Sequence, residues 1–358
     1  MYKFLIYISY TYAIPIGKPL ENEINKRGFE VKWFSDEEEA KNELLKSDSP
    51  VLLDIEEVIA FEPHIILAAT DSIPDFINAL KVQIFHGFNA EKRKFEIDHF
   101  RIRGLFDLYC TQGPSTTSVF KNLQKKQPHF DVIETGWSKV DPLFPVTTKE
   151  KSEVPIVFMA STFTERLSLA YDNEVFEEIK KLSKTGTYKF LMVLHPKIPT
   201  EIVNKWKALE NKYFTFYDTT DLIPLFIKSD IMFADTTSAI QEFLLQKKPV
   251  VTFKHFLEKD YLIQIEEADK IEKSFELALT YPEELINKIE KYVLNLHPYF
   301  DGKSSERIVN ASIDFLHKNK SYLKPKPLNL VRKLKMRMHL DYYTLTSHNK
   351  PFTIKRKN

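Results

Sequence analysis

Short apolar runs of strand length alternate along this chain with segments of helical periodicity, and this alternation limits the possible folds more than any other feature. Six runs lie in the first part of the chain, at 4–8, 29–33, 65–69, 82–85, 105–110 and 132–134. Five more lie in the second part, at 156–159, 190–194, 214–217, 231–234 and 250–253. Because strands that alternate with helices build parallel sheets, the pattern predicts an α/β protein with two doubly wound, Rossmann-like units.

The length of 358 residues exceeds one typical core and suits two domains. The chain becomes irregular and charged after Gly136, so we predict one domain over 1–146 and a second over 154–300. Two such domains can face each other across a cleft, and ligands of open α/β sheets bind at the carboxyl ends of the strands. Residues 301–320 are predicted to form a helix that ends the second domain or crosses back to the first.

Composition excludes several classes of protein. A net charge of +1 gives no reason to expect a nucleic acid partner. The single cysteine, Cys110, cannot form an internal disulfide, and because it follows an apolar run we expect it to be buried and structural. No basic leader and no apolar run of about 18 residues occurs, so we expect a cytoplasmic protein, peripheral at most to the inner face of the membrane.

Common cofactor and metal motifs are missing from the sequence. It contains no GxGxxG, no GxxxxGK[ST], no HExxH, no GxSxG and no cluster of cysteine and histidine. Dinucleotide-binding, P-loop, zinc-protease and serine-hydrolase interpretations therefore lose their usual support. We expect a protein that uses no cofactor and no metal ion.

The most informative segment for chemistry is 219–253, where a predicted strand ends and a predicted helix begins at Asp235, Thr236, Thr237 and Ser238. Backbone N–H groups at the start of a helix are unpaired and the helix dipole is positive there, so the position suits phosphate. The same residue types are also ordinary helix caps, and that interpretation remains open.

A second candidate loop follows the predicted strand 156–159. Ser161, Thr162 and Thr164 place three hydroxyl groups there. They indicate either another loop that faces phosphate or a simple turn rich in serine and threonine.

Two histidines occupy matching places in the two predicted domains. His86 follows the run 82–85 and precedes Gly87, which permits a close backbone approach. His195 follows the run 190–194. A histidine at the end of a strand can face the predicted cleft and serve as a general base, although a structural role remains the alternative for each.

The segment 321–358 has ten basic residues and one acid, Asp341. Val331, Leu334 and Met338 lie at helical spacing among the cations. The pattern predicts either a basic amphipathic segment on an anionic membrane surface or a solvated tail.

Several of these landmarks occur in an order that resembles the CDP-glycerol glycerophosphotransferase family, the transferases of teichoic-acid and capsule polymers with a GT-B-type fold. The matching stretches are QIFHGF (83–88), FDLYCTQGP (106–114), TGWSKVDPLF (135–144), FMASTF (158–163), VLHP (193–196), the segment 221–253 and DGKSSERI (301–308). Together they span about residues 80–315.

The resemblance implies a function and roles for particular residues. An acceptor hydroxyl of a polymer or lipid-linked acceptor would attack the β-phosphate of CDP-glycerol, and CMP would leave without the help of a metal ion. His86 corresponds to the general base and His195 to the histidine that holds the transferred phosphate. Thr237 and Ser238 correspond to the hydroxyls that hold the diphosphate, and Thr162 to their loop partner.

Two departures from the family pattern keep alternatives open. The family's Asp-Tyr-Ser-Ser is Asp-Thr-Thr-Ser here, and Phe85 stands where the family has Trp. The stretches SAIQEF and DGKSSERI are also similar to UDP-GlcNAc 2-epimerases, but the first loop reads ISYTY in place of their Gly-Thr-Arg-Pro-Glu type. The alternatives are therefore a nucleotide-sugar glycosyltransferase or epimerase-like enzyme, and a GT-B module that binds glycan without catalysis.

Overall fold

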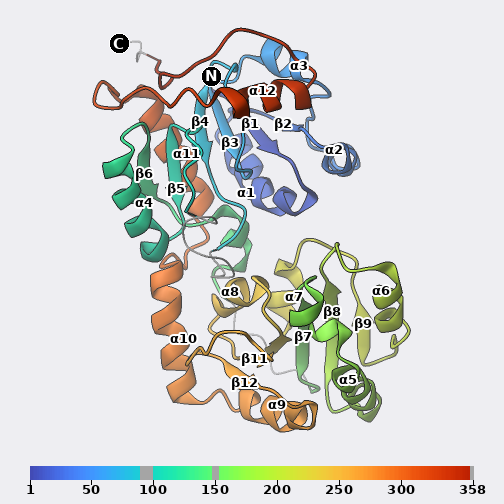
Figure 1. Ribbon diagram of the computed structural model, residues 1–358. Helices are drawn as coiled ribbons and strands as arrows, with labels where there is room; N and C mark the ends of the chain where they lie inside the picture. Colours follow the sequence, from blue (N-terminus) through green and yellow to red (C-terminus); the bar gives the residue numbers. More distant parts are fainter. Residues whose placement is uncertain (89–99, 147–152, 355–358) are drawn as a thin grey trace. The chain divides into compact units, whose positions relative to one another are not determined.

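The computed structural model describes residues 1–88, 100–146 and 153–354, and it divides into two compact units. The first unit comprises Met1–Phe144 and Leu296–Asn358, and the second comprises Pro145–Asn295. Each unit contains one sheet with helices around it (Figure 1). Most of the charged stretch expected to link two domains, 147–153, lies outside the described residues.

All strands of the first sheet are parallel. In spatial order they are β2 (Glu30–Ser35), β1 (Lys3–Ile8), β3 (Ile65–Ala68), β4 (Leu80–Gln83), β5 (Leu108–Thr111) and β6 (Asp131–Glu134). The helices of this unit are α1 (Ile14–Lys26), α2 (Glu38–Leu45), α3 (Ile55–Phe61), α4 (Pro114–Lys126), α11 (Ser304–His317) and α12 (Leu330–His339), with short 3-10 turns at Thr11–Ala13 and Ser138–Leu143.

The second sheet is also parallel, and its strand order reverses between β10 and β7. In spatial order its strands are β12 (Ile263–Ile265), β11 (Val250–Phe253), β10 (Ile231–Ala234), β7 (Ile156–Ser161), β8 (Lys189–Leu194) and β9 (Phe214–Phe216). Its helices are α5 (Asn173–Thr185), α6 (Thr200–Lys207), α7 (Ile223–Lys228), α8 (Ala239–Leu244), α9 (Ile271–Leu279) and α10 (Glu283–Leu296), with 3-10 turns at Glu165–Leu167, Leu169–Tyr171 and Ala268–Lys270.

The predicted α/β class with two parallel sheets is confirmed, and each predicted apolar run contributes to a strand. One strand was missed. β12 has three half-buried residues at the edge of the sheet, so it lacks the continuous apolar run that buried parallel strands show.

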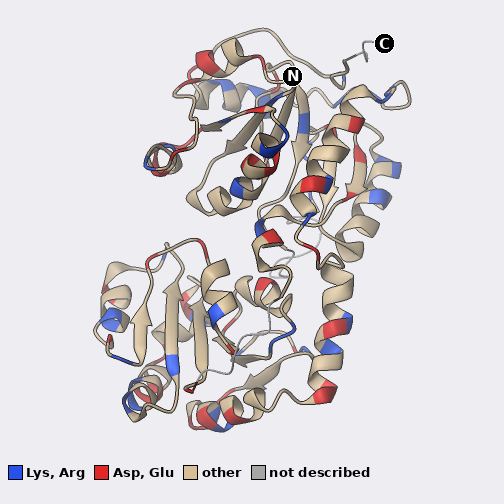
Figure 2. Cartoon of the chain, turned by 180° about the vertical axis from the view of Figure 1, so that it is seen from behind, with Lys and Arg blue, Asp and Glu red and all other residues tan. Residues whose placement is uncertain are grey.

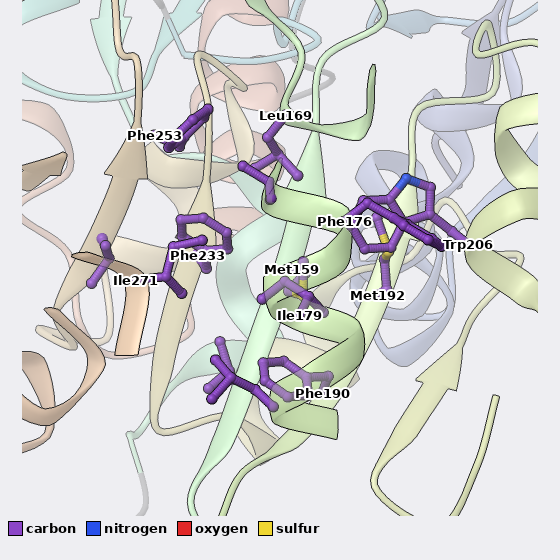
Figure 3. Packing of buried hydrophobic residues seen from close by; sticks show 14 of the residues in the cluster. Met159, Leu169, Phe176, Ile179, Phe190, Met192, Trp206, Phe233, Phe253 and Ile271 are labelled. Carbon is purple, nitrogen blue, oxygen red and sulfur yellow. The ribbon is translucent and has the colours of Figure 1, made fainter. Parts of the chain in front are cut away.

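Burial on both faces of the sheet explains why these runs are apolar throughout. In the second unit, Met159 and Phe233 pack with Ile179 of α5 on one face (Figure 3). Phe158, the neighbour of Met159, points to the other face, where its ring contacts that of Phe226 at 5.1 Å. Successive strand residues thus enter opposite core layers.

Charged residues of both signs interleave along the helices, as α10 illustrates (Figure 2). None of the helices within the described ranges is long and apolar enough to cross a membrane. Cys110 is buried, as expected, and burial raises the pKa of its thiol to about 12.

Part of the basic tail packs against the first unit, and its last residues, 355–358, lie outside the described residues. Lys326 forms an ion pair with Asp107 at 2.6 Å, and both side chains are almost completely buried. Arg337 of α12 donates hydrogen bonds to Asp75 over a sequence separation of 262 residues. Charge counting in 321–358 could not reveal this arrangement, because both acidic partners lie far away in the sequence.

Candidate active-site residues at the sheet edges

Asp235 connects the loop after β10 with the loop after β7, where the strand order of the second sheet reverses. It follows β10, and its carboxylate accepts hydrogen bonds from Ser161 Oγ at 2.5 Å and from the Thr162 and Leu169 N–H groups at 3.0 Å. Asp235, Ser161 and Thr162 are all buried. The carboxylate therefore holds the loop after β7 in place. The hydroxyl groups of the three residues after Asp235 lie at the start of α8.

Those hydroxyl groups differ in their surroundings. Thr236 is buried, and its Oγ1 finds no hydrogen-bond partner among the described residues. Thr237 is half-buried and its Oγ1 accepts weakly from the Ala239 N–H at 3.4 Å. Ser238 is the exposed N-cap residue of α8, and its side chain makes no capping hydrogen bond. Thr236 and Ser238 thus offer hydroxyl groups without using them to stabilise the helix start.

His195 lies at the end of β8, next to the loop after β7. Its Nδ1 accepts a hydrogen bond from the Lys197 N–H at 3.1 Å, and its ring contacts that of Phe163 at 4.6 Å. An Nδ1 that accepts carries no proton, so the neutral ring holds its proton on Nε2 as a donor. Thr164 is half-buried and begins the 3-10 turn Glu165–Leu167, where its carbonyl accepts from Leu167.

In the first unit, a strained backbone presents His86 to solvent. Phe85 has a φ of 59°, a left-handed conformation that is costly for a bulky residue. Its carbonyl accepts a hydrogen bond from Trp137 Nε1 at 3.2 Å, and the Gly87 carbonyl accepts from Gln112 Nε2 at 2.9 Å. His86 is exposed between these two fixed carbonyl groups.

Trp137 is itself held by a buried histidine. Its N–H donates to His297 Nε2 at 3.1 Å, and its indole ring packs edge-on against Phe88. Burial, assisted by the charge of Arg307, lowers the pKa of His297 to about 4, so this ring is neutral and able to accept. The chain of contacts from His297 through Trp137 to Phe85 fixes the loop that carries His86.

Asp141 attaches the start of α11 to the same region. Its Oδ1 accepts from the Ser304 N–H at 2.8 Å, and its Oδ2 accepts from the N–H and hydroxyl of Ser305, each at 2.7 Å. Gly136, with a φ of 82°, lies so close that a Cβ would come within 2.4 Å of Ser304 Oγ. The stretches 135–144 and 301–308 therefore dock on each other.

The structure groups the predicted residues into two sets. Ser161, Thr162, Thr164, His195 and Asp235–Ser238 gather at the edge of the second sheet, and His86 and Gly87 lie at the edge of the first. Three supporting residues were missed by sequence reasoning: Gln112, Trp137 and His297. The first two lie within the quoted family stretches, so a signal existed. Across the described residues, no group of three His, Cys, Asp or Glu side chains could hold a metal ion.

The two parallel sheets and their loops define a GT-B-like protein, and comparison with solved structures supports this class. The wall teichoic acid polymerase TagF in a CDPG-soaked histidine-to-asparagine variant has a TM-score of 0.67 at 14% identity, with 87% of this chain and 88% of that chain covered. A putative UDP-N-acetylglucosamine 2-epimerase from Listeria monocytogenes has a TM-score of 0.61 at 16% identity, with 89% and 98% covered.

Sequence comparison finds a family match in the middle of the chain. Residues 107–262 match the model of the CDP-Glycerol:Poly(glycerophosphate) glycerophosphotransferase family. Over 153 residues the chain is 29% identical to the minor teichoic acid biosynthesis protein GgaB of Bacillus subtilis (strain 168). That alignment covers 38% of this chain but only 16% of the length of GgaB.

Proposed function

We propose that this protein transfers phosphoglycerol, or a closely related group, from a CDP-activated donor to a hydroxyl group of a cell-surface polymer or a lipid-linked acceptor. One observation carries the proposal: Thr236 and Ser238 offer unused hydroxyl groups at a strand-to-helix junction inside the matched region 107–262. Donors of this kind at a helix start suit the charged oxygens of a diphosphate.

The donor is assigned to the second unit. In this assignment Thr236, Thr237 and Ser238 bind the diphosphate. His195 donates from Nε2 to the phosphoryl group that is transferred, because its Nδ1 is occupied as an acceptor. Asp235 and Ser161 act indirectly, since they hold the loop that contains Thr162 and Thr164.

The acceptor is assigned to the first unit. The acceptor oxygen attacks the β-phosphorus of the donor, the bond from that phosphorus to the bridging oxygen breaks, and CMP leaves with the bond electrons. His86 takes the proton of the attacking hydroxyl. General bases of this kind contribute about 10²- to 10⁴-fold to a rate.

We further propose that catalysis does not require a metal ion. The charge that develops on the transferred group would be offset by His195 and by the N–H groups at the start of α8. A test with chelator is direct: turnover measured in EDTA should equal turnover measured with added Mg²⁺.

The main alternative is a different activated donor, such as a nucleotide sugar. The fold similarity to UDP-N-acetylglucosamine 2-epimerases motivates it. A non-catalytic glycan-binding module is a third possibility, and the supported geometry around His86 argues against it, because strain of this kind is typical of functional sites.

Thermal shift with three donors separates these alternatives. A ligand that binds only the folded state at about 100 times its Kd stabilises the protein by about 2.7 kcal/mol. We expect CDP-glycerol to raise Tm, and UDP-GlcNAc and CMP-Kdo to leave it unchanged. A rise with UDP-GlcNAc alone would favour the sugar transferase.

Substitutions then locate the donor. Replacing Ser238 by Ala should weaken CDP-glycerol binding by roughly 1–3 kcal/mol, the usual effect of losing a hydrogen bond to a charged group. His195→Ala should lower both donor affinity and turnover. Ser321→Ala, an exposed serine of the first unit, is the matched control and should change neither. Unchanged donor affinity in both Ser238→Ala and His195→Ala would place the donor elsewhere.

A further inference from the structure

Helix α12 packs on the first unit with two of its cationic side chains inward. Lys333, Met336 and Arg337 are buried, while Leu330 and Val331 are 70% and 71% exposed. A surface helix of a globular protein normally has the opposite arrangement, with the apolar stripe facing the core.

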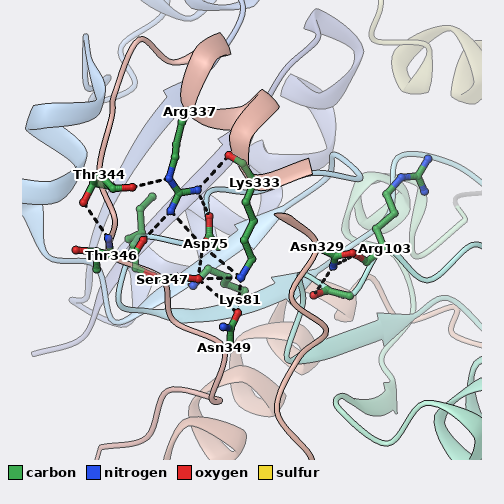
Figure 4. A network of polar contacts seen from close by, with 12 residues as sticks. Asp75, Lys81, Arg103, Asn329, Lys333, Arg337, Thr344, Thr346, Ser347 and Asn349 are labelled. Carbon is green, nitrogen blue, oxygen red and sulfur yellow. Dashed lines mark hydrogen bonds and ion pairs between the residues drawn. The ribbon is translucent and has the colours of Figure 1, made fainter. Parts of the chain in front are cut away.

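Buried charge interactions explain this orientation (Figure 4). Asp75 accepts a hydrogen bond from Arg337 Nη1 at 2.7 Å and one from Ser347 Oγ at 2.6 Å, and Lys333 Nζ lies 3.5 Å from its carboxylate. Arg337 also donates to the carbonyls of Thr344 and Thr346. Turning the apolar face inward would leave Asp75 buried without its partners, which is strongly unfavourable. The fold therefore keeps the apolar side chains of α12 outside.

The exposed side chains form one contiguous stripe. Leu330, Val331, Leu334 and Met338 follow one another along a single helical face, and each is more than half exposed. Tyr343 and Leu345 continue the exposed apolar residues beyond the helix. Scattered apolar residues are normal on a protein surface, but a contiguous patch marks an interaction surface.

Cations border this stripe. Lys335 is exposed and Arg332 is half-buried on α12, and Arg101 and Arg103 lie close enough to Arg332 to act on it electrostatically. Arg103 is paired with Asp71 at 2.8 Å, which leaves the cluster positive overall. The partner of this surface must therefore accept apolar side chains and carry negative charge.

We propose that this surface, made of the exposed face of α12 with Arg332 and Lys335, binds an anionic lipid bilayer. An apolar stripe bordered by cations is how helices lie in the interface of a membrane, with the apolar side chains inserted and the cations at the headgroups. A second copy of the chain fits less well, because a symmetric interface would bring Arg332 and Lys335 close to their own counterparts. This inference is independent of the proposed transfer reaction.

Vesicle co-sedimentation with the full chain tests the proposal. Wild type should sediment with vesicles of phosphatidylglycerol and phosphatidylcholine, and much less with phosphatidylcholine alone. The triple substitution Val331→Gln, Leu334→Gln and Met338→Gln should lower the partition coefficient at least tenfold. Its melting temperature should not fall, because all three side chains point outward.

Matched variants separate this face from general surface effects. Leu277→Gln with Leu294→Gln removes two apolar side chains that are 50% and 53% exposed on the second unit, and should leave partition unchanged. Arg332→Gln with Lys335→Gln should reduce partition about fivefold per removed charge, and raised salt should abolish the difference. Lys212→Gln is the charge control.

Three results would overturn the proposal. The first is equal partition of wild type and the triple variant. The second is no sedimentation of wild type with anionic vesicles. The third is a wild-type dimer in solution that the triple variant abolishes without any vesicle binding, which would assign the face to a second copy. Donor binding is measured without vesicles, so failure of the transfer proposal leaves this result intact.

Discussion

The carboxyl edges of the two sheets are built by different means. At the second sheet a buried carboxylate, Asp235, accepts hydrogen bonds from three groups, one at the end of β7 and two in the segment that follows it. At the first sheet no such carboxylate holds the loop of His86 among the described contacts. There, a left-handed Phe85 and the hydrogen bonds from Trp137 and Gln112 fix it.

The difference matches the roles that we propose for the two edges. Groups that bind a diphosphate must point N–H and O–H bonds at a common centre, and an acceptor-only side chain behind the loop can orient them. A general base must instead be held exposed at one place without a partner that would compete for its proton. The left-handed backbone of Phe85 and its contact with Trp137 hold His86 in this way, and they add no charge next to it.

Replacing His86 gives the largest expected effect. His86→Ala should lower turnover by about 10²- to 10⁴-fold, because no other group would take the proton of the acceptor. Donor affinity should stay the same, since we assign the donor to the second unit. Steady-state turnover and CDP-glycerol binding measure the two quantities. His339→Ala, an exposed histidine of α12, is the control. If the His86→Ala variant keeps nearly wild-type turnover, His86 is not the general base.

Asp235→Asn tests the other edge. The amide nitrogen cannot accept, so at least one buried donor loses its partner and the second unit should be destabilised by about 2–4 kcal/mol. Donor affinity should fall as well, because the loop after β7 loses its orientation. Urea unfolding and donor titration measure these changes, with the 92% exposed Asp218 replaced by Asn as control. Full stability of the Asp235 variant would show that the carboxylate does not hold the loop.

His297 predicts how the first edge responds to acid. Burial lowers the pKa of its folded form from 6.5 to about 4, so between these pH values the unfolded chain binds a proton that the folded chain does not. The free energy of unfolding should therefore fall as pH falls through this window, by on the order of 3 kcal/mol. His297→Gln keeps an acceptor for the Trp137 N–H and should remove this part of the pH dependence. Urea midpoints at pH 7 and pH 4.5 for both proteins would show it, and parallel losses would contradict it.

Trp137→Phe should have the smallest effect. It removes the hydrogen bond from the indole to the Phe85 carbonyl, which contributes about 1 kcal/mol, so turnover should fall by about tenfold or less. Because the loop of His86 moves and the donor edge does not, KM for the donor should be unchanged. Trp33→Phe is the control: it is equally buried in the first unit, and its indole nitrogen has no hydrogen-bond partner within the described part of the chain. A large rise in donor KM would contradict this account.

Local patterns were sufficient to predict much of the fold. Runs such as 231–234 and 250–253 are apolar because both faces of each sheet are covered, and strand identity follows from that alone. The hydroxyl groups at 235–238 were likewise visible as a strand-to-helix junction. The role of Asp235 was not visible, because its hydrogen-bond donors Ser161 and Leu169 lie more than 60 residues away in the sequence.

The tail shows the limit of such patterns most clearly. Its spacing correctly indicated a helix with Val331, Leu334 and Met338 on one face, and that face is exposed. Counting charges treated all of its cations alike and did not reveal that Lys326, Lys333 and Arg337 are buried. Only the fold brings Asp75 and Asp107 to these cations, since nothing in the local sequence encodes a partner more than 200 residues away.

The first unit is made of two separate stretches of the chain, and this determines which unit can fold first during synthesis. Domains of a nascent chain fold as their residues emerge, starting from the N-terminus. Here, residues 1–144 must wait for α11 and α12, whereas the second unit has all its residues once Asn295 has emerged. The middle of the chain can therefore finish folding first, and until the tail arrives Asp75 and Asp107 remain without the cations that neutralise them. A nascent chain arrested once Leu296 has left the ribosome should carry a protease-resistant second unit attached to an incomplete, protease-sensitive first one.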